Sequence, residues 1–222
     1  MSYFRKILLA GFTVMLLGLA GGQAQADLIQ TGSFENPVPA GRWGSFRASS
    51  VAGWDSPDML EFQKSSLFGP AAEGNQYLEL DSKRRDRNHF LTQAFSTSIG
   101  TRYTLRFAFS PRPRHADNIL EVGIGGLNDF SLFQGIVARA SGAGLRQTAW
   151  TYYTLDFVAT GTQTRIGFRD AGRDDALGSL LDAVSVTAVT AATPEPGTLV
   201  LLASSLGGLA AWRRRRKLAV RA

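Results

Sequence analysis

Residues 103–110 read Tyr-Thr-Leu-Arg-Phe-Ala-Phe-Ser, in which large apolar residues alternate with smaller or polar ones. Successive side chains of a β-strand point to opposite faces, so this alternation predicts a strand with one face buried and one in solvent. The pattern recurs at 120–124, 153–157 and 165–169. Further strands are predicted at 28–34, 59–62, 76–80, 90–96 and 180–189.

The chain between these strands supplies turns rather than crossover helices. Stretches such as Asn36-Pro37-Val38-Pro39-Ala40-Gly41 and Ser110-Pro111-Arg112-Pro113 are typical of loops. Parallel strands would need helical connections, and no long segment shows apolar residues at helical spacing. The sequence therefore predicts an all-β fold, an antiparallel β-sandwich or jelly roll, in one domain at 27–190.

Charge is concentrated at the two ends of the chain. The 222 residues include 24 Lys and Arg, 18 Asp and Glu and no Cys, for a net charge of +6. Residues 27–193 contain 16 basic and 17 acidic side chains, so the central region is nearly neutral. Each terminal cluster adjoins an apolar run, as charges that set membrane topology do, and we expect no nucleic-acid partner. Without Cys, the core must form without disulfides.

The N-terminus has the features of an export signal. Arg5 and Lys6 precede the apolar stretch 7–20, and Ala24-Gln25-Ala26 provides small residues for cleavage. A 14-residue stretch is short for a bilayer core of about 30 Å, which argues against a permanent helix. We therefore expect a signal peptide at 1–26.

The C-terminus combines three features in a fixed order. Pro194-Glu195-Pro196 is followed by the mostly apolar stretch 198–212 and then by the basic run 213–217. This tail resembles the PEP-CTERM sorting signal of exported proteins from Gram-negative bacteria that make extracellular polysaccharide. The resemblance implies a sorting tail at 191–222 and processing by an exosortase, a membrane-embedded cysteine peptidase. It also implies at least transient anchoring in the inner membrane, followed by residence in the periplasm, at the outer cell surface or in a secreted matrix.

The central region carries a second resemblance. Its opening at 28–35, Gly53-Trp54, Glu73-Gly74-Asn75-Gln76-Tyr77-Leu78-Glu79-Leu80 and its close at 181–186 resemble exported domains with a galactose-binding-like jelly roll. Many proteins of that kind are carbohydrate-binding modules or cell-wall-associated proteins. Thr31 and Ala183 depart from the pattern, which commonly has Asn and Asp there.

Asp182 is the most informative single position. Counted by twos, it shares a strand face with the apolar residues Leu180, Val184 and Val186. A buried carboxylate needs a cation, an arginine or a set of backbone donors, since an unpaired one costs several kcal/mol. The jelly-roll resemblance implies one structural calcium ion with Glu35 and Asp182 as ligands. The alternative places Asp182 at a solvated strand entrance, where it caps a turn or pairs with an arginine.

Candidate sugar-binding residues are aromatic or basic residues of loops. Trp43 and Phe46 follow a Pro- and Gly-rich stretch, and an aromatic face packs well against the C–H face of a pyranose ring. Arg85, Arg87 and His89, together with the loop at 112–115, predict a basic rim for acidic polysaccharide. The alternative is two solvated loops whose charge is offset by nearby aspartates.

Catalysis has little support in the sequence. The chain has two histidines, both in polar segments, and no Gly-x-Ser-x-Gly elbow. We therefore expect a non-catalytic envelope or matrix protein that binds carbohydrate. Two alternatives remain open: a carbohydrate-active enzyme of the same fold, and a self-associating scaffold that binds no glycan.

Overall fold

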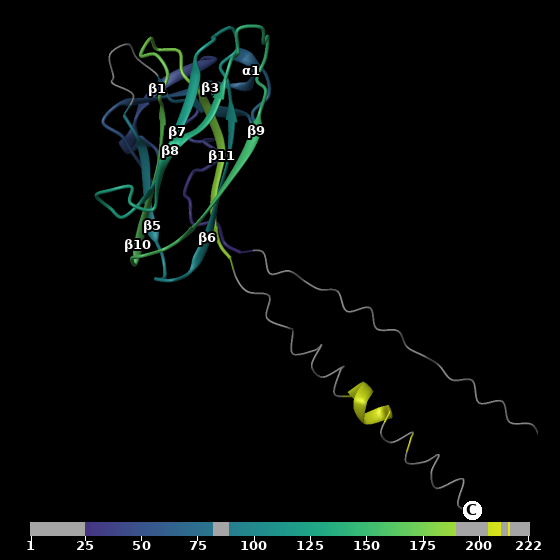
Figure 1. Ribbon diagram of the computed structural model, residues 1–222. Helices are drawn as coiled ribbons and strands as arrows, with labels where there is room; N and C mark the ends of the chain where they lie inside the picture. The colour runs from purple at the N-terminus through teal and green to yellow at the C-terminus, as the bar shows by residue number, and fades with distance from the viewer. Residues whose placement is uncertain (1–24, 82–88, 190–203, 210–212, 214–222) are drawn as a thin grey trace, which may run out of the picture.

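The computed structural model describes residues 25–81, 89–189, 204–209 and 213, and it confirms the antiparallel β-sandwich (Figure 1). Eleven strands are present in the described part of the chain. They are β1 (Trp43–Arg47), β2 (Trp54–Asp55), β3 (Met59–Lys64), β4 (Gln76–Glu79), β5 (Leu91–Ser96), β6 (Arg102–Ser110), β7 (Asn118–Gly125), β8 (Phe133–Ala140), β9 (Thr151–Val158), β10 (Gln163–Asp170) and β11 (Leu180–Ala188). Two short helices, η1 (Ala48–Ser50) and α1 (Ser65–Phe68), lie in connections.

The strands form two sheets. One has the order β1-β3-β4-β11-β6-β9 and the other the order β2-β5-β10-β7-β8, with antiparallel pairing throughout. From β4 onward the chain passes repeatedly from one sheet to the other, as in a jelly roll. The domain limits predicted at 26/27 and 190/191 stay predictions.

The core lies between the sheets and is rich in aromatic residues. Phe107 of β6 meets Phe168 of β10 with ring centroids 5.1 Å apart, which joins the two layers. Both side chains are fully buried, as are Leu105, Leu120 and Ile166. The alternation read from the sequence at 103–110 therefore does point one face of β6 into the core.

Two sequence predictions about the fold are wrong. Residues 28–34 do not form a strand, because Thr31 and Phe34 adopt left-handed backbone conformations with φ of 53° and 52°. The count by twos in β11 also fails, because a β-bulge after Asp182 inserts an extra residue, with Ala183 at φ 50°. Asp182 therefore does not share a face with Val184 and Val186, which belong to the central core.

Candidate functional site

The outer face of the five-stranded sheet carries two glycines side by side. Gly167 of β10 is directly opposite Gly123 of β7 and Thr92 of β5 in the antiparallel register. A Cβ atom on Gly123 would lie 2.5 Å from the ring of Phe130, and one on Gly167 would lie 2.8 Å from it. Glycine in a strand interior often marks a close approach. Here it lets an aromatic ring lie directly on the sheet.

Phe130 reaches this position because the loop between β7 and β8 folds back over the sheet. Asp129 accepts hydrogen bonds from the backbone N–H groups of Gly126 and Ser131, at 3.1 and 3.0 Å. Hydrogen bonds from Ser131 and Gly126 lower the pKa of the Asp129 carboxyl below its ordinary value. Phe90, next to β5, packs against Phe130 with ring centroids 4.6 Å apart. The two rings form an aromatic pair on the sheet surface.

Two arginines of β10 stack on this pair. The guanidinium of Arg165 lies 4.7 Å from the centroid of Phe130, and that of Arg169 lies 4.6 Å from the centroid of Phe90. Cations in this position are attracted by the negative face of the ring. Arg169 also pairs with Glu121 of β7, with 2.5 Å between Nε and Oε2.

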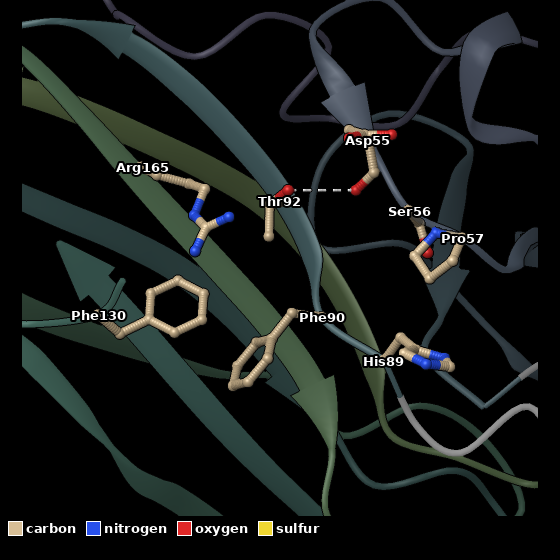
Figure 2. Close-up of a pocket in the computed structure, with 8 residues that line it drawn as sticks. All are labelled: Asp55, Ser56, Pro57, His89, Phe90, Thr92, Phe130 and Arg165. Atoms are coloured by element: carbon tan, nitrogen blue, oxygen red, sulfur yellow. Dashed lines mark hydrogen bonds between the residues drawn. The ribbon is translucent and has the colours of Figure 1, made fainter. Parts of the chain in front are cut away.

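A pocket of about 270 Å³ opens beside the aromatic pair (Figure 2). Phe90, Phe130 and Arg165 line one side, and the segment that follows β2 lines the other. Thr92 lies between them, and its hydroxyl donates to the carbonyl of Asp55 at 3.4 Å. The full lining is Asp55, Ser56, Pro57, His89, Phe90, Thr92, Phe130 and Arg165. Apolar rings with a few hydroxyl, carboxylate and guanidinium groups are the usual surroundings of a small polar ligand.

The predicted ligand residues are not brought together. His89 lines the pocket, with its Nδ1 atom 2.8 Å from Asp58 Oδ2. Trp43 is 55% exposed but lies on β1, an edge strand of the other sheet. Phe46 packs edge-on against Phe62, so its ring belongs to the core side and offers little surface to a sugar. Arg85 and Arg87 lie outside the described residues.

In the loop 112–115, the other half of the predicted basic rim, Arg114 is exposed and Arg112 is partly buried. Arg112 forms an ion pair with Glu79, 2.6 Å from Nε to Oε1, and its side chain is 18% exposed. Burial raises the pKa of Glu79 well above its ordinary value, and the charge of Arg112 opposes this. Arg112 therefore balances an internal carboxylate instead of facing a polysaccharide.

Two buried carboxylates, those of Asp81 and Asp170, bind the backbone of the segment between β10 and β11 rather than face a ligand. Asp81 Oδ2 accepts from the N–H groups of Asp175 and Ala176, and Asp170 Oδ1 accepts from the N–H and hydroxyl of Ser179. Burial raises the pKa of Asp170, and it raises that of Asp81 to about 6. Both residues are at most 1% exposed and neither lines the pocket.

Glu35 and Asp182, the predicted calcium ligands, both contact the segment 72–76. Asp182 is fully buried and accepts from the N–H groups of Ala72, Glu73 and Ala183, while Glu35 accepts from those of Asn75 and Gln76. Burial raises the pKa of Asp182 to about 7, although these three donors oppose the shift. Asp182 thus has the set of backbone donors that a buried carboxylate can take in place of a cation or an arginine.

Sequence reasoning missed the aromatic pair and its arginines. Phe130 lies in the loop Gly126-Leu127-Asn128-Asp129-Phe130, which reads as an ordinary turn. The available signal was the glycines at 123, 125 and 167, which interrupt otherwise regular strands and mark a close approach.

A family model described as the PEP-CTERM protein-sorting motif matches residues 192–216. This confirms the sorting tail read from the sequence and marks an exported protein that is sorted through the membrane. Pro194, Glu195 and Pro196 fall within the matched range but outside the described residues. Residues 204–209 are helical. Among the described residues, no helix combines the length and the hydropathy needed to cross a membrane.

Solved structures resemble the sandwich at low sequence identity. An arabinose-bound α-L-arabinofuranosidase, MgGH51, matches with 16% identity and a TM-score of 0.48 over 75% of this chain, which spans 27% of that protein. TmCBM61 in complex with β-1,4-galactotriose matches with 12% identity and a TM-score of 0.43, over 74% of this chain and 100% of that one. The CBM22-1 xylan-binding domain of Paenibacillus barcinonensis Xyn10C matches with 15% identity and a TM-score of 0.42, over 77% and 99%. No curated protein sequence matches the chain.

Proposed function

We propose that this exported protein binds carbohydrate, without cleaving it, through the outer face of its five-stranded sheet. The observation that carries the proposal is the aromatic pair of Phe90 and Phe130, which forms one wall of a pocket with polar groups around it. A sugar presents an apolar C–H face to an aromatic ring and hydroxyl groups to polar neighbours. Thr92, Ser56 and Asp55 supply hydroxyl and carboxylate groups beside the rings.

The C-terminal sorting motif indicates where in the cell the sandwich would bind its ligand. The sorting motif at 192–216 supports delivery through the inner membrane and processing by an exosortase. We place the mature sandwich in the cell envelope or in the extracellular polysaccharide matrix. Mass spectrometry of the protein from its native host tests this: removal of the tail is expected, and a chain that still ends at Ala222 would contradict it.

Glycan-array binding tests the sugar site. Wild-type protein is expected to bind at least one glycan, and Phe130→Ala is expected to lose about tenfold or more in affinity because it removes an apolar ring that lines the pocket. Trp43→Ala is the matched control, since Trp43 is an exposed aromatic residue on the other sheet. Equal binding by Phe130→Ala and wild type would place the sugar elsewhere.

The enzyme alternative is separated by assaying the release of reducing sugar. Hydrolysis of a glycoside requires two carboxyl groups on either side of the bond. Glu79, Asp81 and Asp170 are buried and hold the protein's own loops. We expect no release from any bound glycan. Turnover that Asp170→Asn abolishes without unfolding the protein would establish the enzyme instead.

We also propose a structural calcium ion held by Glu35 and Asp182. The partners described for buried Asp182 are three neutral N–H groups, so none of them supplies a positive charge to the carboxylate. Calcium is bound by oxygen ligands, and carboxylates are among those it takes most often. Among the described residues, no three acidic or histidine side chains converge on one point, so backbone carbonyls would complete the shell. Such an ion would tie the N-terminal segment to β11. Calcium is expected to raise the melting temperature, and an unchanged melting curve with EDTA or millimolar calcium would disprove the site.

A further inference from the structure

We propose that the pocket selects an anionic sugar, a uronic acid residue within a polysaccharide, and that Arg165 binds the sugar carboxylate. This inference rests on the proposed function, since it names the class of sugar that the aromatic pair receives. It is carried by a comparison between the two arginines of β10.

Arg165 and Arg169 occupy equivalent positions on β10. They lie on the outer face two steps along the strand from Gly167, one before it and one after it, and each stacks on one ring of the aromatic pair at nearly the same distance. Arg169 has a carboxylate partner, Glu121, on the neighbouring strand. The position next to Arg165 on that strand is Gly125, which has no side chain to offer. Within the described residues, Arg169 therefore has an ion-pair partner, whereas Arg165 has none.

The donor groups of Arg165 are only partly used. Its Nε atom is buried and makes no hydrogen bond, and no carboxylate of residues 25–81 or 89–189 forms an ion pair with it. A guanidinium carries five N–H donors in a planar fork that matches a carboxylate. No hydrogen bond is described for the two Nη groups of this fork, so they are the donors that the two oxygens of a ligand carboxylate would meet.

The acidic groups near Arg165 are committed to other partners or lie at the far wall. Asp129 accepts two backbone N–H groups of its own loop, and although the charge of Arg165 helps to lower its pKa, the two side chains form no ion pair. Asp55, on the opposite wall, is exposed to solvent. Asp58 pairs with His89. Arg165 is thus the cation that faces the aromatic side of the pocket, where the ring of a bound sugar would lie (Figure 2).

Paired polymers test the inference. The probes are polygalacturonate, alginate and glucuronan, each beside the same polymer after chemical reduction of its carboxyl groups. We expect at least one acidic polymer to bind at least tenfold more tightly than its reduced form. In Arg165→Gln this preference should fall below twofold. Arg106→Gln is the matched control, because Arg106 stacks on Tyr152 at 3.9 Å on the other sheet and its loss removes the same charge.

The two proposals fail differently. If acidic and reduced polymers bind equally and Phe130→Ala weakens both, the sugar site stands and the choice of an anionic sugar is wrong. If Arg106→Gln removes the preference as fully as Arg165→Gln, net charge explains it and the assignment to Arg165 is wrong. If none of the six polymers binds, the inference is overturned, and the glycan array separately decides whether carbohydrate binding survives. A thermal melt of Arg165→Gln that matches the wild type excludes unfolding as the cause.

Discussion

Glu35 and Asp182 hold the two ends of a single loop. Asp182 Oδ2 accepts from the backbone N–H groups of Ala72 and Glu73, both at 2.9 Å. Glu35 Oε1 accepts from those of Asn75 and Gln76, at 2.8 and 2.9 Å. Gly74 lies between them with φ at 70°, directly against the Glu35 carboxylate, where a side chain would not fit. Two segments far apart in the sequence thus fix the loop that leads into β4.

Replacing Asp182 by Ala is expected to lower the free energy of unfolding by about 3 kcal/mol or more. The change removes the acceptor of three N–H groups, of which one is buried and two are partly buried, and hydrogen bonds to a charged group contribute roughly 1.5–3 kcal/mol each. Urea denaturation measures the effect. Asp156→Ala is the control, because Asp156 is exposed and its carboxylate accepts a hydrogen bond from the Thr104 hydroxyl at the surface. Equal losses in the two variants would show that the loop does not depend on Asp182.

Gly123→Ala is expected to weaken glycan binding by about tenfold while the fold survives. The new Cβ would lie 2.5 Å from the Phe130 ring, so the ring must lift off the sheet and leave Phe90. Gly135→Ala on β8 is the matched control, because its Cβ would meet Phe133 at an ordinary 3.6 Å. Calorimetric titration of both variants with a glycan that the wild type binds makes the comparison. Wild-type affinity in Gly123→Ala would mean that the ring position is irrelevant to the sugar.

Asp81 is expected to make the protein less stable as the pH rises from 4 to about 6.5. Burial raises the pKa of Asp81 from its ordinary 3.8 to about 6, so the folded state keeps a proton that the unfolded chain has released. The resulting stabilisation is complete below the unfolded pKa and is lost as the pH passes through the folded one. It amounts to at most about 3 kcal/mol.

Asp81→Asn isolates this effect from the other buried carboxylates. The amide oxygen still accepts from Asp175 and Ala176, and the amide nitrogen takes the place of Oδ1, which has no hydrogen-bond partner among the residues that the structure describes. Denaturation at several pH values should therefore give a shallower decline for the variant than for the wild type. Parallel profiles would show that Asp81 titrates normally in the folded state.

The sequence predicts the fold well wherever alternation is clean, and fails where the backbone leaves the regular register. β6 follows the period of two, with its core face buried. The sequence does not predict β8, which has a single buried residue, Ala138, and therefore no clean alternation. Asp182 was assigned to the wrong face because nothing in the residue types of β11 announces a bulge at Ala183.

The candidate site was harder to predict than the fold because it depends on contacts between distant segments. Trp43 was selected by residue type, yet the aromatic pair joins Phe90 to a ring from the β7–β8 loop. Whether an arginine is neutralised is also a spatial property. Arg165 and Arg169 look alike in the sequence, and only the register of β10 with β7 places Glu121 beside one and Gly125 beside the other.

Gly32→Ala is expected to destabilise the protein by about 3 kcal/mol, since the bulge in β11 brings another backbone against this glycine. Val184 donates its N–H to the Gly32 carbonyl at 2.9 Å, and a Cβ on Gly32 would overlap the Val184 carbonyl oxygen. Backbone atoms on both sides cannot move aside as a side chain can, so the cost should lie at the upper end of that for overpacking. Gly144→Ala is the control, because its Cβ would meet open space, and its effect should stay within about 0.5 kcal/mol. If thermal denaturation gives the two variants the same stability, residues 28–34 are not held against β11 as described.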